Sequence, residues 1–191
     1  MVFSTDTIPK LSLAEFLEMP ETKPAREYIN GKVYQKPMPQ GKHSTLQGRL
    51  TTAINQVGES QQLVFAFPEL RCTFGGRSLV PDISVFEWRR IPLDNKGEIE
   101  NRFEIYPDWV IEILSPEQTD ARLTEKIIFC LNQGTKLGWL IDPKERLVIT
   151  FQPKQQPEVK QDLDILPVIA VLEDWQLSAA DLFQWLSFRR G

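Results

Sequence analysis

The sequence has little of what disulfide frameworks, zinc sites and membrane spans require. Only two cysteines occur among 191 residues, and Cys72 and Cys130 stand far apart, outside any spacing typical of paired metal ligands. No apolar run approaches the ~18 residues of a membrane helix, and the first residues lack the basic stretch and apolar core of a signal peptide. We therefore expect a protein of the reducing cytoplasm, without a membrane partner.

An excess of positive charge is also missing. The formal net charge is −4, whereas nucleic-acid binding usually leaves a basic footprint. This argues only mildly against such a partner, because a locally basic face can coexist with carboxylates that await a metal. The hydrophobic share of 41% and the charged share of 25% are ordinary for a globular chain. We expect one domain over residues 1–191, with a core of about residues 43–142.

Hydrophobic periodicity predicts a mixed α/β fold. Helices are expected where apolar residues recur every three or four positions, and strands where β-branched and aromatic residues form short runs. The expected helices are residues 12–19, 43–57, 115–133 and 178–186. The expected strands are a hairpin at 26–34, then 63–67, 69–74, 80–86, 107–114, 137–141 and 147–151, with polar loops at 88–106 and 153–162. Together they predict a mixed sheet flanked by helices, with a helical crossover between the strands at 107–114 and 137–141.

Capping residues predict where two helices begin. Ser12 and Glu15 can form a capping box at the first helix. Ser115 and Gln118 can form another, with Pro116 at the first helical position. We therefore expect a helix to follow the strand at 107–114 without an intervening loop.

Glycines predict the turns. Asn30 and Gly31 are typical of a type I′ hairpin turn, which needs positive φ at both central residues. Gly58 and Gly134 are expected to end the two long helices. The glycines at 75 and 76 are expected to turn the chain back into the strand at 80–86.

Two apolar strands each carry one carboxylate in their interior. Asp82 lies in residues 80–86 (VPDISVF), and Glu112 lies in residues 107–116 (PDWVIEILSP). An ionised carboxylate in such a strand costs several kcal/mol unless a cation, a metal or good hydrogen bonds compensate it. A divalent metal held for the hydrolysis of a phosphodiester is one shared explanation for both.

Asp108 competes with Asp82 as the second metal ligand. It shares a face with Glu112, but four residues of extended strand separate the two by roughly 13 Å. One ion cannot bridge that gap, because its oxygen ligands lie about 2.0 to 2.6 Å away. Asp82 can lie within about 5 Å of Glu112 if the two strands are neighbours. We therefore predict Asp82 and Glu112 as the ligands.

Lys126 is the candidate cation of the site. It lies on the helix entered directly from the Glu112 strand, next to the apolar residues 127–129. A lysine beside a metal-bound phosphate can orient the attacking water or offset the charge that grows on the phosphate oxygens. A lysine on a solvated helix can equally be a surface residue.

Several segments carry a resemblance to a known family. They are residues 27–31 (EYING), 43–47 (HSTLQ), 80–85 (VPDISV), 107–116 (PDWVIEILSP), Lys126 and 138–143 (GWLIDP). In this order and spacing the chain resembles the Uma-two family of endonucleases, within the restriction-endonuclease-like PD-(D/E)xK superfamily. The resemblance implies a core of helix, three strands, helix and strand (αβββαβ), here with an N-terminal helix and hairpin and a C-terminal helix added.

The resemblance also implies a catalytic site. It places Mg²⁺, or Mn²⁺, on Asp82 and Glu112, and DNA as the substrate. The superfamily's lysine falls two residues after the second acid, where this chain has Leu114. In some members it lies instead on the following helix, at the place that Lys126 occupies.

Three further residues are candidates for the same site. Glu27 could donate to the metal or pair with a lysine across its hairpin. Glu69 could share a face with Asp82 or stand as a solvated edge charge. His43, the only histidine, could cap the first long helix or contact a DNA phosphate.

The prediction is a magnesium-dependent endodeoxyribonuclease that uses Asp82, Glu112 and Lys126. The alternative is a catalytically inactive protein of the same fold that binds nucleic acid or a protein partner, because the usual lysine is missing after Glu112. RNA or branched DNA stays open as the substrate. A homodimer would suit the cutting of a duplex.

Overall fold

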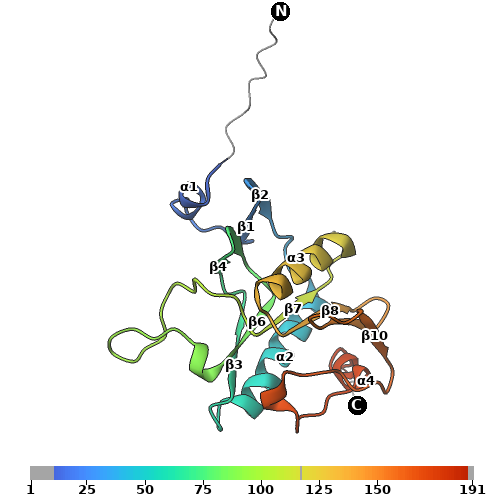
Figure 1. Ribbon diagram of the computed structural model, residues 1–191. Coiled ribbons are helices and arrows are strands. Elements are labelled where there is room, and N and C mark those ends of the chain that lie inside the picture. Colours follow the sequence, from blue (N-terminus) through green and yellow to red (C-terminus); the bar gives the residue numbers. More distant parts are fainter. Residues whose placement is uncertain (1–10, 117, 189–191) are drawn as a thin grey trace, which may run out of the picture.

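The computed structural model describes residues 11–116 and 118–188 and contains two β-sheets (Figure 1). The helices are α1 (Leu13–Leu17), α2 (Gly41–Gly58), α3 (Asp120–Gln133) and α4 (Ala179–Gln184), with short 3-10 turns at Trp88–Arg90 and Ala170–Leu172. The larger sheet has the order β10 (Glu158–Gln161), β9 (Leu147–Phe151), β8 (Leu137–Asp142), β7 (Trp109–Ile113), β6 (Ile83–Glu87) and β3 (Val64–Pro68). The smaller sheet has the order β2 (Lys32–Gln35), β1 (Arg26–Ile29), β5 (Arg77–Leu79) and β4 (Cys72–Phe74).

Four strands of the larger sheet, together with α2 and α3, form the expected αβββαβ core. In chain order this core is α2, β3, β6, β7, α3 and β8. Strands β3, β6 and β7 pair antiparallel, whereas β7 and β8 pair parallel across the α3 crossover. The predicted mixed sheet flanked by helices is therefore confirmed, as are the helix and hairpin before it and the helix after it.

Alternation along β7 decides which layer each side chain meets. Ile111 belongs to a buried cluster with Leu50 of α2, and Val110 belongs to a second cluster with Ile127 of α3. Because successive side chains of a strand point to opposite faces, Glu112 shares the face of Val110. The carboxylate of Glu112 thus points toward α3.

The local signals at the chain's turns and caps are confirmed in most places. Asn30 and Gly31 have φ angles of 52° and 82° in the β1–β2 turn. Ser12 forms its capping box at the start of α1. Gly58 ends α2, and Gly134, with φ 120°, follows the last residue of α3.

Several sequence-based expectations about the helices and strands were wrong. The helix after β7 begins at Asp120 and not at Ser115, because Ser115 and Gln118 instead close a short turn before the N-cap Thr119. The polar stretch expected as a loop at 153–162 contains β10, which pairs with β9. The expected strands at 63–67 and 80–86 form β3 and β6 of the larger sheet. The expected strand at 69–74 forms β4, which instead pairs with β5 in the smaller sheet.

No helix among the described residues is both long enough and apolar enough to cross a lipid bilayer.

Candidate active site

Asp82 and Glu112 lie side by side at the junction of β6 and β7. The antiparallel register pairs Ile83 with Ile111, so Asp82 and Glu112 stand opposite each other one step further along. The backbone N–H of Ile113 donates to Asp82 Oδ2 at 2.7 Å. Both carboxylates are buried, with 2% and 0% of their residue surfaces exposed. The expected adjacency of these two acids is confirmed.

Asp82 has two side-chain partners from outside strands β6 and β7, Lys36 and His43. Lys36 Nζ lies 2.6 Å from Oδ1 and also donates to the carbonyl oxygen of Val80 at 2.8 Å. His43 Nε2 lies 3.1 Å from Oδ2. Burial disfavours the charged form, but Lys36 and His43 outweigh it and hold the pKa of Asp82 well below its usual range. Asp82 is therefore an ionised carboxylate at neutral pH.

Lys126 lies between two buried carboxylates. Its Nζ is 2.7 Å from Glu27 Oε1 and 2.8 Å from Glu112 Oε1, and the lysine is 3% exposed. Glu27 reaches the site from β1 and is held in place by the N–H of Val80, which donates to Oε1 at 2.8 Å. Burial opposes the charge on Lys126, but Glu112 and Glu27 outweigh it and raise its pKa. Lys126 thus couples the smaller sheet to β7.

Glu112 is the least satisfied carboxylate of the group. Neither of its oxygens makes a hydrogen bond within residues 11–116 and 118–188, although Lys126 lies in ionic contact. Burial, opposed by Lys126 and reinforced by the negative charge of Asp82, raises the pKa of Glu112 to about 8. Buried polar groups are normally hydrogen-bonded, so the capacity of Glu112 that the Lys126 ammonium leaves unused is open to a cation or a proton.

The donor set fits a hard divalent cation. In the described parts of the chain, no three histidine, cysteine, aspartate or glutamate side chains gather closely enough to hold an ion alone. Mg²⁺, however, is commonly bound through one or two carboxylates, with waters and substrate phosphates completing its shell. The unsatisfied oxygens of Glu112, beside ionised Asp82, meet that requirement.

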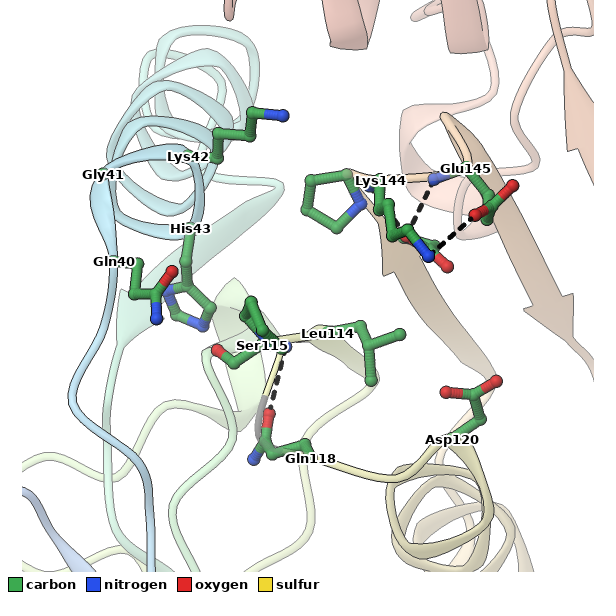
Figure 2. A pocket seen from close by; sticks show the side chains of 13 residues that line it. Gln40, Gly41, Lys42, His43, Leu114, Ser115, Gln118, Asp120, Lys144 and Glu145 are labelled. Atoms are coloured by element: carbon green, nitrogen blue, oxygen red, sulfur yellow. Dashed lines mark hydrogen bonds and ion pairs between the residues drawn. The ribbon is translucent and has the colours of Figure 1, made fainter.

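Two cavities border this cluster through partners of its acids, and neither is lined by Asp82 or Glu112 themselves. The smaller, about 300 Å³, is lined by Glu27, Lys36 and Lys126 together with the start of α3. The larger, about 680 Å³, lies between the first turn of α2, the loop after β7 and the turn after β8, and His43 forms part of its wall (Figure 2). Gln118 lines both cavities, so they adjoin at the loop between β7 and α3.

Asp108 and Glu69 lie outside the cluster. Asp108 is fully buried near the opposite end of β7, where Arg90 Nη1 lies 2.7 Å from Oδ2 and Lys136 Nζ lies 3.1 Å from Oδ1. It holds the end of β6 in place by accepting from the N–H of Glu87. Glu69 was wrongly expected in a strand: it is exposed, with φ 49°, and only its backbone N–H meets the carbonyl oxygen of Asp82.

Sequence reasoning missed Lys36. This lysine follows β2 in the sequence and stands 46 positions before Asp82, with which it pairs at 2.6 Å. A lysine after an exposed hairpin strand carries no periodic signal that distinguishes it from a surface residue. The only available indication was indirect, namely that buried Asp82 needed a cation that the β6 segment does not provide.

Comparison with known proteins is consistent with this geometry. Residues 13–180 match the family model Uma2, described as "Putative restriction endonuclease". A solved structure described as "a putative nuclease belonging to DUF820 from Anabaena variabilis ATCC 29413" superposes with a TM-score of 0.91 at 52% identity, over 93% of this chain and 99% of that chain. Among curated proteins, none matches the chain. Because the family model spans most of its length, the chain belongs to the Uma2 restriction-endonuclease family.

Proposed function

We propose that this protein is a divalent-metal-dependent endonuclease that hydrolyses phosphodiester bonds of DNA, with Asp82 and Glu112 as the metal ligands and Lys126 as an assisting cation. The observation that carries the proposal is the buried pair Asp82 and Glu112, opposite each other on adjacent strands, with the oxygens of Glu112 lacking hydrogen bonds to the described residues. Membership of the family supports a nucleic-acid substrate.

The ion would be Mg²⁺, or Mn²⁺. Bound at Asp82 and Glu112, it would polarise the phosphodiester and lower the pKa of the attacking water. The chain's own residues supply the orientation, because Asp82 is fixed by the N–H of Ile113 and by Lys36. This arrangement pre-positions the carboxylate without a change of rotamer when substrate arrives.

Lys126 contributes a fixed positive charge. Its ammonium is held by Glu27 and Glu112 and lines the smaller cavity, so it faces the space that an anionic substrate would enter. A charge whose position is already fixed stabilises the negative charge that grows on phosphate oxygens without reorganisation. Lys126 thereby replaces the lysine that Leu114 does not provide.

A second candidate function is the binding of nucleic acid without cleavage. One observation favours it: each acid of the site already has a lysine partner, Lys36 on Asp82 and Lys126 on Glu112. Internal cations that neutralise the acids compete with a metal for the same oxygens. Measurement of cleavage separates the two functions directly.

The test compares two aspartates with the same substitution. Asp82→Asn should abolish Mg²⁺-dependent cleavage of plasmid and single-stranded DNA, because the ligand charge is lost. Asp108→Asn should retain cleavage, since this equally buried acid pairs with Arg90 and Lys136 away from the cluster. Circular dichroism checks that both variants fold, and an RNA substrate tests the alternative polymer. Equal loss of activity in both variants, or none in Asp82→Asn, would refute the assignment.

The cellular setting and assembly complete the proposal. Cys72 and Cys130 are free, buried thiols, which suits a reducing cytoplasm. Two copies would let each site cut one strand of a duplex, so we propose a homodimer on DNA. Sedimentation of the protein with and without a duplex measures this, and a one-to-one complex that cuts both strands at once would contradict it.

A further inference from the structure

The two oxygens of Asp82 are not equally engaged. Oδ2 has two neighbours, the backbone N–H of Ile113 at 2.7 Å and His43 Nε2 at 3.1 Å. Oδ1 has one partner among the described residues, the ammonium of Lys36 at 2.6 Å. Because each carboxylate oxygen offers about two lone-pair sites, the capacity left for a metal lies on Oδ1. The two contacts on Oδ2 hold the carboxylate in place even when Oδ1 exchanges its partner.

The ammonium of Lys36 lies at a point that also suits a hard cation. Its Nζ donates to the carbonyl oxygen of Val80 at 2.8 Å as well, so oxygens of Val80 and Asp82 converge on one position. Carboxylate and carbonyl oxygens are ligands that Mg²⁺ and Mn²⁺ prefer. Two cations on one buried oxygen repel each other strongly. An ion that binds Asp82 Oδ1 therefore competes with Lys36.

Lys36 has room to move. It follows β2, the edge strand of the smaller sheet, and lines the smaller cavity of about 300 Å³ together with Glu27. The backbone N–H of Lys36 donates to the carbonyl oxygen of Ala25 at 2.9 Å, so the main chain can stay fixed while the flexible side chain turns. The Val80 N–H and Lys126 Nζ both contact Oε1 of Glu27. Oε2 is left, within the described residues, to receive a displaced ammonium.

Lys126 is held more firmly than Lys36. Its ammonium contacts two carboxylates, Glu27 at 2.7 Å and Glu112 at 2.8 Å, whereas Lys36 contacts one carboxylate and one neutral carbonyl group. Departure of Lys126 would leave two buried acids with less compensation. Departure of Lys36 would uncover only Asp82, which the incoming ion itself compensates. Lys36 is therefore the lysine that can exchange with a metal.

We propose that Lys36 is the exchangeable cation of this site: before a metal binds, its ammonium lies on Asp82 and the Val80 carbonyl oxygen, and metal binding moves it to Glu27 in the smaller cavity. The Val80 carbonyl then becomes a third oxygen ligand, besides Asp82 and Glu112. The inference rests on the proposed function, since it requires the metal site, and it names the residue that limits the affinity of that site.

The decisive variant is Lys36→Met, which keeps most of the stem and removes the ammonium. The matched control is Lys136→Met, the same change of charge at a lysine that also contacts a buried aspartate, Asp108 at 3.1 Å, away from the site. Titration with Mn²⁺ gives the dissociation constant from the electron paramagnetic resonance signal of the unbound ion. This measurement needs neither DNA nor cleavage.

The exchange predicts tighter metal binding when the lysine is lost. Lys36→Met should bind Mn²⁺ about tenfold to a hundredfold more tightly than wild type, the value of one charge-assisted contact, while Lys136→Met should stay within about twofold. Weaker or unchanged binding in Lys36→Met, or equal tightening in both variants, would overturn the exchange and leave the metal site in place. No Mn²⁺ binding by wild type or Lys36→Met would refute the metal site, and the exchange with it.

A crystal of the wild-type protein soaked in Mn²⁺ decides the same question if Lys36→Met fails to fold. With the ion bound at Asp82, Lys36 Nζ should lie beyond hydrogen-bond distance of that carboxylate and within about 3.2 Å of Glu27 Oε2. The Val80 carbonyl oxygen should be among the ligands of the ion. An ammonium still on Asp82 Oδ1 beside the bound ion would overturn the proposal.

Discussion

Removal of the charge on Lys126 should destabilise the protein strongly. The variant Lys126→Met keeps most of the buried stem and deletes the ammonium that touches Glu27 at 2.7 Å and Glu112 at 2.8 Å. At an effective dielectric of about 20 each contact corresponds to about 6 kcal/mol of attraction, most of which offsets the cost of burying the charges. The deletion leaves two buried carboxylates with less compensation, and removal of one partner from such a group costs about 3–5 kcal/mol.

For a chain of this length, the loss corresponds to a fall in melting temperature of about 6–20 °C. Urea titration at about pH 9, above the pKa of Glu112, gives the free energy of unfolding with this carboxylate ionised, and a double-mutant cycle with Glu112→Gln isolates the contact. The two substitutions should be non-additive by about 0.5–3 kcal/mol, because each removes the same interaction. A loss below about 1 kcal/mol in Lys126→Met, or strict additivity in the cycle, would refute the view that this lysine holds the buried acids together.

Two further predictions concern pH and packing. Because burial raises the pKa of Glu112 to about 8 from 4.5, the metal-free fold keeps a proton that the unfolded chain releases. The stability contributed by Glu112 is therefore present below pH 4.5 and lost as pH rises to about 8. Glu112→Gln should flatten this part of the curve of unfolding free energy against pH, which urea titrations measure. An unchanged slope would contradict the prediction. Gly58→Ala should destabilise the fold by about 1–3 kcal/mol, because its Cβ would lie 2.4 Å from Val64 Cγ2 and 2.7 Å from the Val64 carbonyl oxygen. Gly48→Ala lies in open space on the same helix and should stabilise the fold by about 0.5–1 kcal/mol. Thermal melts of both variants measure the difference. Equal effects of the two alanines would argue against this packing.

The sequence predicts the metal-ligand candidates because their signal is local. A carboxylate inside a short β-branched run, as at Asp82 and Glu112, is anomalous by itself, and strand geometry suffices to separate Asp82 from Asp108. The helical crossover after β7 similarly places Lys126 near Glu112 without any tertiary information. These three residues could therefore be grouped before their contacts were known.

The remaining features depend on contacts between distant segments. Lys36 reaches Asp82 because the small sheet is placed over the α3 face, and no local pattern encodes that placement. The chain likewise passes from β5 in the smaller sheet to β6 in the larger sheet within a few residues. Because all of these residues favour extended structure, the sequence does not mark where one sheet ends and the other begins. The late start of α3 shows the same limit, because Ser115 and Thr119 are both acceptable N-caps and the fold selects the second.

The most direct measurement is the anomalous diffraction of a crystal soaked in Mn²⁺. A cation at the proposed site should give a peak within about 2.0–2.6 Å of one oxygen of Asp82 and one of Glu112. The Asp82→Asn crystal should lose that peak. A manganese ion bound elsewhere, or none near these two carboxylates at saturating concentration, would contradict the claim that they form a metal site.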